Sequence, residues 1–398
     1  MTFFSAIPVP ETHIGIATEV TRGTPVAPEF WLPISGPKYK PDRQYLPDAG
    51  LRGSMVTLYD EVPGLRYDSH AWDAHPYLDS LPVFLRALLG SKDTKTTAPA
   101  STKLVKAAKV GDTKILALAE IAEGSYIVIG TGAGSIETHL TGKPKEVKVG
   151  EFEIPLIFPL IFAHANEATV TGLTKHAFSL LNNSVTTGNQ PPSMTLTDFA
   201  GEESWRQLTA AQLNTLNIKG AADSLPTVSM DWFCNPAIKP EAPEPSYSTA
   251  EAPAGWTVQA SIGGVAVPYL VNWEFDMKRN VKNVPAITGT ESYYQHFAGA
   301  LEAISKMTFL EDPASTQLTN YQNGETLAVD LTLSDVASGF AVNLHSTKAK
   351  YITGDLDRSK EWVEAILELQ LIPSATDALA GGVSPIIATV ANAHTAEY

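Results

Sequence analysis

The sequence predicts a mainly β protein in which two similar β-rich units follow each other and a small all-β module is inserted into the first. Three observations support this prediction. Short runs of alternating apolar and polar residues, typical of half-buried strands, recur along the 398 residues. A stretch rich in proline and glutamate at 237–254 separates two halves of the chain. The features that precede this stretch recur after it in the same order.

The composition is that of a globular protein, with 44% hydrophobic and 18% charged residues. The chain has 43 Asp and Glu and 28 Lys and Arg, which gives a net charge of −15. This charge argues against a protein that binds nucleic acid tightly through a basic surface. The single cysteine, Cys234, excludes an internal disulfide framework and a multi-cysteine metal site. Neither an export signal nor a membrane-spanning run is visible, so we expect a soluble protein made in a cytoplasm.

The first unit begins with a short β-like pattern at 13–34, followed by the most unusual stretch of the chain. Residues 38–67 read KYKPDRQYLPDAGLRGSMVTLYDEVPGLRY, with scattered apolar residues and frequent proline and glycine. A loop of this length is uncommon inside a compact domain, and its aromatic and β-branched residues argue against disorder. We interpret it as a long arm, in the form of a loose β-hairpin, that is ordered by contact with a neighbouring subunit. A weaker version recurs at 277–292.

A short amphipathic helix is expected after the arm, in YLDSLPVFLRALLGS. Ser80 is suited to the N-cap, Pro82 to the first turn and Gly90 to the position after the C-cap. Four leucines fall on one face of this helix, namely Leu81, Leu85, Leu88 and Leu89.

The composition then changes, because a polar linker leads into short β-runs separated by glycine turns, which we interpret as the inserted module. The first unit resumes with a strand in SMTLTDF. The segment SWRQLTAAQLNTLNIKG is expected to combine a short helix with a strand that ends at Gly220, and TVSMDWF is expected to be another strand.

The second unit repeats this order. VNWEFDMKRNVKNVPAITGTES echoes ISGPKYKPDRQYLPDAGLRGS, and alternation from Val363 to Leu371 indicates a well-buried strand. The Ala/Thr/Gly-rich end of the chain, from Ser374, is expected to be flexible or docked on a neighbouring subunit. The predicted division is 1–95 (first unit), 96–175 (module), 176–236 (first unit, resumed), 237–254 (linker), 255–373 (second unit) and 374–398 (flexible tail).

Chemistry-bearing residues were weighed and set aside. The most tempting cluster, in RYDSHAWDAHPYLD, has a spacing that matches no metal motif, and polar residues before a helix are the better interpretation. The motifs GxSxG and HExxH, the EF-hand loop and the Walker sequence are absent from the sequence. We therefore assign no catalytic, cofactor or metal residues. The cluster consists of Asp68, His70, Asp73, His75 and Asp79.

The segment GIATEVTRGTPVAP and the arm sequence LPDAGLRGS resemble the N-terminal region of tail tube (major tail) proteins from long-tailed bacteriophages, especially siphophages of actinobacteria. The resemblance implies a β-sandwich flanked by a helix, whose strands from six copies close into a ring. Stacked rings would form a hollow tube that carries the genome. Because the family pattern has one such domain, two tandem copies imply a ring of three subunits with pseudo-sixfold symmetry in preference to a hexamer.

The resemblance also implies a location in the virion tail after synthesis in the host cytoplasm. The expected partners are further copies of the chain, other tail proteins and phage DNA that passes through an acidic lumen without specific binding, with no membrane and no cofactor. The inserted module should lie outside the tube. The residues expected to contact neighbouring subunits or rings lie in the two arms: Lys40, Arg43, Tyr45, Leu46, Pro47, Asp48, Leu51, Arg52, Met55, Tyr59, Arg66, Arg279, Lys282, Val284 and Pro285.

Two other classes of function remain open from the sequence. A non-polymerising β-rich adhesion or carbohydrate-binding protein, or another virion decoration protein, would stay monomeric at high concentration. A hydrolytic enzyme using the histidine–aspartate cluster would lose activity when His70 and His75 are replaced by alanine.

Overall fold

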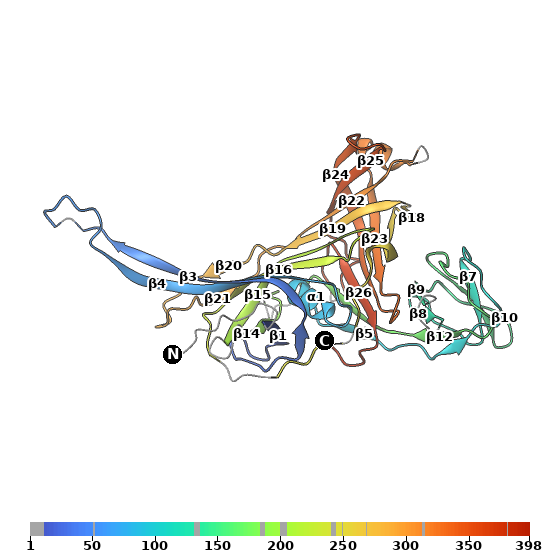
Figure 1. Cartoon of the computed structure of the whole chain (residues 1–398), viewed down its shortest axis with the longest axis horizontal. Coiled ribbons are helices and arrows are strands. Elements are labelled where there is room, and N and C mark those ends of the chain that lie inside the picture. The colour runs from blue at the N-terminus through green and yellow to red at the C-terminus, as the bar shows by residue number, and fades with distance from the viewer. Residues whose placement is uncertain are drawn as a thin grey trace, which may run out of the picture.

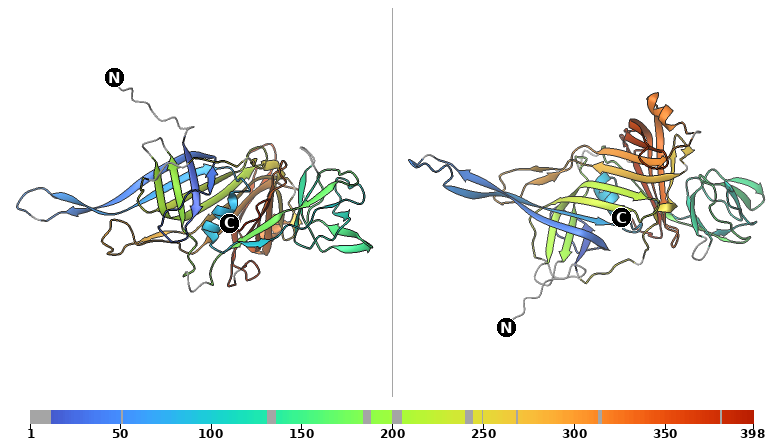
Figure 2. Two further views of the ribbon diagram at one scale, coloured as in Figure 1. Left: turned by 90° about the horizontal axis from the view of Figure 1, so that it is seen from below. Right: turned by 45° about the horizontal axis from the view of Figure 1, so that its top comes forward.

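The computed structural model describes residues 12–50, 52–130, 136–183, 188–199, 205–239, 244–248, 250–267, 269–312, 315–379 and 381–398. Two short α-helices and many antiparallel strands make up this part of the chain, so the prediction of a mainly β fold is confirmed. A long hairpin projects from one end of the molecule and a compact set of short strands lies at the opposite end (Figures 1 and 2).

The first half, without the module, contains nine strands and one helix. They are β1 (His13–Thr18), β2 (Phe30–Leu32), β3 (Ile34–Asp48), β4 (Asp60–Ala74), α1 (Leu81–Leu89), β5 (Thr94–Thr96), β13 (Thr174–Ser179), β14 (Met194–Phe199), β15 (Arg206–Ala221) and β16 (Thr227–Cys234).

The module lies between β5 and β13 and is all β, as predicted. Its strands are β6 (Thr102–Lys103), β7 (Lys114–Ala117), β8 (Tyr126–Ile129), β9 (Glu137–Leu140), β10 (Lys145–Lys148), β11 (Glu151–Pro155) and β12 (Thr169–Gly172). They form two small sheets around a separate apolar cluster that includes Ile127, Ile154 and Val170.

The second half begins with a 3-10 turn and also contains one α-helix. Its elements are η2 (Gly255–Thr257), β17 (Gln259–Ile262), β18 (Val265–Ala266), β19 (Leu270–Lys278), β20 (Lys282–Val284), β21 (Gln295–Phe297), β22 (Glu302–Leu310), α2 (Gln317–Gln322), β23 (Thr326–Ser334), β24 (Ala341–Asp357), β25 (Glu364–Leu371) and β26 (Ile387–Asn392).

The two halves share one order of strand pairing. In the first half β1, β14, β15, β16, β4 and β3 are neighbours in that order. In the second half β17, β23, β24, β25, β22 and β19 follow the same order. The halves are joined because β15 also pairs with β19. One apolar core runs through both halves, so the domain boundaries listed above stay a prediction.

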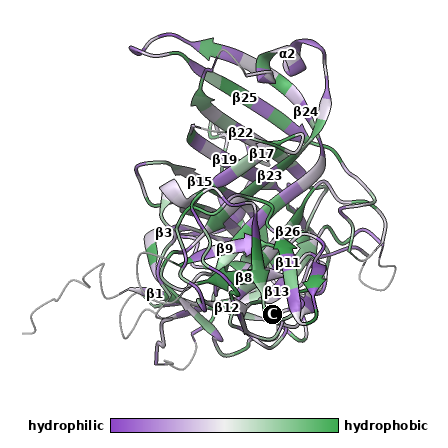
Figure 3. Ribbon diagram, turned by 90° about the vertical axis from the view of Figure 1, so that its right-hand side faces the viewer, coloured by the Kyte–Doolittle hydropathy of each residue, from purple (hydrophilic) through white to green (hydrophobic). Residues whose placement is uncertain are grey.

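The strands of the second half have the alternation that a sheet with one buried face requires (Figure 3). In β25 Ala365, Leu367, Leu369 and Leu371 are buried, while Ile366 points away from the core and is exposed. The prediction of a well-buried strand is therefore confirmed for 364–371, whereas Val363, which was expected to begin the alternation, is exposed and precedes the strand.

Helix α1 is confirmed with the predicted ends. Its apolar residues are almost completely buried, and Gly90 ends it with a φ of 87°, a left-handed conformation that glycine adopts without strain. Ser80 precedes the helix but does not cap it, because its hydroxyl donates to the carbonyl oxygen of Tyr77 instead (3.3 Å).

Two sequence-based predictions are wrong. The expected short helix after Trp205 does not form, because β15 is a single strand of 16 residues held by β14 and β19 along one edge and by β16 along the other. The expected flexible tail at 374–398 is folded. β26 pairs with both β13 and β24, and Tyr398 donates from its hydroxyl to the carbonyl oxygen of Asp79 (2.7 Å).

Candidate assembly surfaces

The first arm is a β-hairpin, as expected, formed by the distal parts of β3 and β4 around residues 49–59. It extends well beyond the rest of the molecule (Figure 1). An ion pair joins Arg52 to Asp48, and the Arg52 guanidinium lies 4.7 Å from the centre of the Tyr59 ring. The large apolar side chains of the arm are solvent-exposed, namely Tyr45, Leu46, Met55, Val56, Leu58 and Val62. Several exposed large apolar side chains on one short segment are typical of a contact site.

The second arm continues the β19–β22 hairpin through β20 and β21. It lies against the first half of the chain. Arg22 donates to the carbonyl oxygen of His296 (2.7 Å), and the Gln190 amide exchanges two hydrogen bonds with the backbone of Ala298 (2.8 and 3.2 Å). The side-chain oxygen of Asn214 accepts a hydrogen bond from the backbone N–H of Val281 (2.9 Å). This arm therefore has its receiving surface inside the same chain.

Arg279 differs from the other predicted contact residues, because the chain itself buries it. Its side chain is 3% exposed, and its backbone N–H donates to the carbonyl oxygen of Asn214 (2.8 Å). Burial lowers the pKa of Arg279 to about 10. Lys282 and Pro285 are exposed and Val284 is half-buried.

The two arms meet at the base of the first. The backbone N–H of Arg66 donates to the carbonyl oxygen of Glu291 (2.8 Å), and the Glu291 carboxylate pairs with Arg43. The Tyr67 and Tyr293 rings make an edge contact at 5.8 Å. Of the remaining predicted contact residues, Lys40 and Pro47 are exposed on β3, Lys40 pairs with Asp42 at 2.7 Å, and Leu51 lies outside the described residues.

A seam of antiparallel pairing joins the two halves. It runs from Thr215 opposite Lys278 to Ala221 opposite Asn272. The side chain of Asn217 donates to Glu274 across this seam (2.5 Å). We call this β15–β19 pairing the internal seam.

Two strand edges of the same kind are open. Within the described residues β3 pairs with β4 alone, although its counterpart β19 is paired on both edges. β24 pairs with β23 as far as Lys350, and beyond that residue it pairs with β25 alone. Sequence reasoning missed the β24 edge. Its only signal was the length of the strand beyond its buried part, with exposed charge at Asp355.

On the side of the sheet that faces away from the core, one row of side chains alternates in charge, and we call this side the charge-alternating face. Eight strands run continuously from β3 through β4, β16, β15, β19, β22 and β25 to β24. A row of directly paired residues crosses four of these strands. Lys219 lies opposite Glu274, Glu274 opposite Lys306 and Lys306 opposite Glu368. The terminal oxygen and nitrogen atoms of Glu368 and Lys306 are 4.0 Å apart.

The histidine–aspartate cluster is not assembled into a site. Asp68 and His70 face the core, where the Nε2 atom of His70 lies 3.3 Å from Asp198. Asp73 points to the opposite, exposed side, and His75 contacts the carbonyl oxygen of Pro226 (2.7 Å). In the part of the chain that the structure describes, no group of three His, Cys, Asp or Glu residues could hold a metal ion. In that part, no helix is long and apolar enough to cross a membrane.

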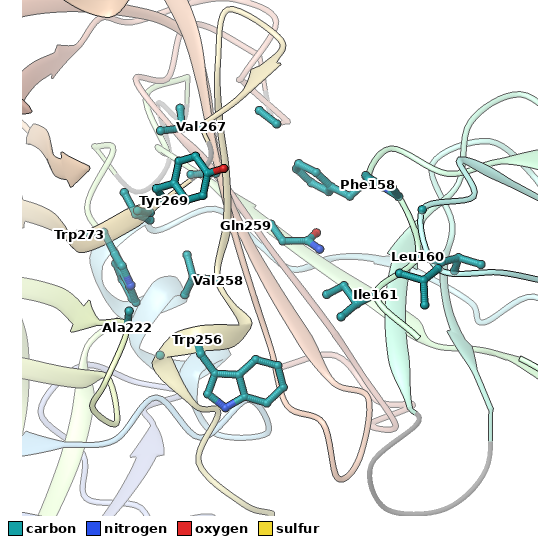
Figure 4. Close-up of a pocket in the computed structure, with 17 residues that line it drawn as sticks. Phe158, Leu160, Ile161, Ala222, Trp256, Val258, Gln259, Val267, Tyr269 and Trp273 are labelled. Carbon is teal, nitrogen blue, oxygen red and sulfur yellow. The ribbon is translucent and has the colours of Figure 1, made fainter. Parts of the chain in front are cut away.

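An apolar groove of about 470 Å³ lies between the module and the second half. Figure 4 shows Phe158 and Ile161 from the module on one side, with Trp256 and Tyr269 from the second half on the other. Trp256 and Trp362 are half-exposed, and the other five tryptophans are buried. Cys234 is also buried, as expected, and burial raises the pKa of its thiol.

The module buries one carboxylate. Glu137 accepts hydrogen bonds from His139 (2.9 Å) and His164 (2.6 Å) and from the backbone N–H groups of Ile161 (2.7 Å) and Phe162 (3.0 Å). Burial alone would raise the pKa of Glu137, but these hydrogen bonds outweigh it and lower the pKa to about 2. Both carboxylate oxygens of Glu137 therefore have their hydrogen-bond partners inside the module.

An exposed apolar arm and unpaired strand edges are features typical of surfaces that contact other chains. The family described as phage tail tube protein matches residues 11–390. A comparison with curated proteins found no match. Membership of the family implies a structural role in the tail tube of the virion. Because the match spans almost the whole sequence, the chain belongs to the phage tail tube protein family.

Proposed function

We propose that the chain consists of two tandem β-sandwich units of tail tube type, and that three copies close head to tail into a ring with pseudo-sixfold symmetry. The supporting observation is the relation between the halves. The second unit joins the first through the internal seam and lays its arm across the first unit. The first unit has the same kind of arm and strand edge, but among the described residues the distal part of this arm and this edge have no partner.

Both arms leave their units toward the same side of the molecule (Figure 1). The contact that the second unit makes with the first is therefore a head-to-tail contact, which uses different surfaces of the two partners. Repetition of such a contact produces a ring if the rotation closes and a filament if it does not. Closure would leave neither arm nor edge without a partner, which removes the aggregation risk of exposed strand edges.

We propose that stacked rings form the conduit for phage DNA and that the charge-alternating face of the eight-strand sheet lines the lumen. Opposite charges lie beside each other there, as in the row from Lys219 to Glu368, so no continuous basic surface is available to bind phosphates. Such a wall lets DNA slide. It refines the expectation of an acidic lumen.

Other tail proteins would cap the stack, and the chain would enter the virion after synthesis in the host cytoplasm. The GIATEVTRGTPVAP and LPDAGLRGS segments support a siphophage of the actinobacterial type as the source. The module, at the end of the molecule opposite the first arm, would project from the tube (Figure 2).

Electron microscopy of the purified full chain tests this proposal, together with native mass spectrometry of the particles. We expect annular particles or tubes with six similar lobes around a central hole and a mass of three chains. Rings of six chains would contradict the pseudo-sixfold arrangement. A chain that remains monomeric at all concentrations would contradict assembly and favour an adhesion or decoration protein.

A further inference from the structure

The two open edges can be placed in register with each other from the internal seam. This step rests on the proposed head-to-tail assembly. If the contact between copies repeats the contact between units, the β24 edge plays the part of β15 and the β3 edge of the next copy plays the part of β19.

Two bulges align β24 with β15. The pairing of β15 with β14 has a register shift between Leu208 and Ala211. The pairing of β15 with β16 has a second register shift just after Leu213. β24 has the corresponding irregularities between Ser346 and Ala349 and after Tyr351. Both bulges give the same offset, so Thr353 corresponds to Thr215 and Leu356 to Ile218.

The alignment of β3 with β19 follows from their shared neighbours. Trp232 lies opposite His70, and His70 lies opposite Tyr39. In the second unit Leu369 occupies the position of Trp232 and lies opposite Ser305, which pairs with Phe275. Tyr39 therefore corresponds to Phe275. Because Phe275 pairs with Ile218 in the internal seam, Tyr39 of the next copy would pair with Leu356.

We propose that the ring closes where residues 353–357 of one copy pair antiparallel with residues 38–42 of the next. In this register Asp355 lies opposite Lys40 and Asp357 lies opposite Lys38. All four side chains point to the charge-alternating face, as Asn217 and Asp276 do in the internal seam. Opposite charges that face each other across strands stabilise the pairing.

The charges also favour this register over its neighbours, because only here do both Asp355 and Asp357 lie opposite a lysine. A shift of two residues toward the tip of the first arm places Asp355 opposite Asp42, where like charges repel. A shift by one residue turns Asp355 toward the core-facing side of β3, where Tyr39 and Pro41 lie. The pairing is therefore specified by charge as well as by the repeat.

Pro41 makes this seam weaker than the internal one. It lies opposite Asp68 in the β3–β4 ladder, and because it has no N–H to donate to β4, its nitrogen faces the open edge. Its counterpart Met277 can donate to the internal seam, so the seam between copies has one hydrogen bond fewer. The same proline protects the open edge from pairing with unrelated strands before assembly.

Cysteine cross-linking of the full chain tests the register. In Lys40→Cys/Asp355→Cys, mild oxidation of assembled rings should link neighbouring copies, seen as dimers and trimers on a non-reducing gel. The native Cys234 is completely buried and should not contribute. Asn217→Cys/Asp276→Cys is the matched positive control, because the same pair lies within one chain and should form a disulfide without linking copies.

A second pair controls for proximity alone. Asp42→Cys/Asp357→Cys lies on the same face but four residues out of register, so it should cross-link far less. Rings that cross-link through this pair and not through Lys40→Cys/Asp355→Cys would overturn the register while the proposed function survives. A wild-type chain that forms no ring would overturn both.

Charge reversal gives a readout that needs no disulfide. Lys40→Asp or Asp355→Lys alone should weaken assembly, by up to about fivefold for each seam. The combined exchange should restore it. Single and combined variants that assemble equally well would also overturn the proposed pairing.

Discussion

The second arm lies against the first half of the chain through several hydrogen bonds, whereas the distal part of the first arm touches nothing else among the described residues. Both arms continue equivalent strand pairs, so local structure does not explain the difference. The second arm has a unit in front of it within the chain and the first does not. Under the proposed assembly, the partner that the free arm lacks is the second unit of a further copy.

Shortening the first arm should have the largest effect on assembly. Replacing residues 45–62 by an Asn-Gly turn should abolish ring formation, because the exposed apolar surface of the arm is lost. The shortened chain should still fold, since this segment contributes nothing to the core. Electron microscopy and thermal unfolding measure the two effects. The matched control is replacement of residues 285–294 in the second arm, which should leave the first arm intact. Rings formed by the chain that lacks residues 45–62 would show that the first arm is dispensable.

The module folds around its own buried groups within one copy of the chain, and its stability should fall at low pH. The pKa of Glu137 falls from its ordinary 4.5 to about 2 in the folded module, so its contribution to stability is present above pH 4.5 and is lost as the pH falls toward 2. Glu137→Gln should remove this dependence and cost on the order of 3 kcal/mol at neutral pH. Hydrogen exchange of residues 102–172 measures it.

Glu153→Gln is the control for that experiment, because Glu153 forms a surface ion pair with Lys114 (2.9 Å) and should change stability little. Ring formation at neutral pH should be similar in both variants. A Glu137→Gln chain with unchanged exchange in the module would contradict the role assigned to this carboxylate.

Asn214→Ala should loosen the docked arm. It leaves the backbone N–H of Val281 buried without an acceptor and removes the 3.1 Å hydrogen bond to Asp231. We expect a loss of about 1–3 kcal/mol in the free energy of unfolding, measured with urea. Thr288→Ala, in the exposed loop of the same arm, should change it by less than about 0.5 kcal/mol. Equal effects of the two substitutions would argue that the arm is not held at Asn214.

The contact between the arms should have the smallest effect. Arg43 and Glu291 form an ion pair near the surface. A double-mutant cycle with Arg43→Ala and Glu291→Ala should give a coupling energy below about 1 kcal/mol, because solvent screens such pairs. A coupling above about 2 kcal/mol would mean that the second arm, and not a neighbouring copy, holds the first arm in place.

Local sequence signals predicted the elements that local interactions determine. The helix at α1 has a proline in its first turn, a glycine after its end and leucines on one face. The arm was identifiable because its prolines, glycines and scattered apolar residues suit neither a core strand nor disorder. The alternation in β25 reports a buried face directly. Each of these signals lies within fewer than forty residues.

Elements imposed by distant partners could not be predicted in the same way. The β15 segment contains Leu, Ala and Gln, which favour helices, but three other strands bind its backbone groups. β26 is built from small residues whose burial depends on β13 and β24. The open edge at 353–357 becomes visible only when every other pairing is known.

The attachment of the module has a practical consequence. The chain leaves the body along β5 and returns along β13, and these strands are paired, with Thr96 opposite Lys175. An insertion whose two ends sit side by side places few demands on what it encloses. A foreign domain with adjacent termini should be tolerated in place of residues 102–172, provided that it covers Ala341 and Ala391, against which Tyr126 and Val128 of the native module pack. Tubes assembled from such chains would display that cargo at regular spacing.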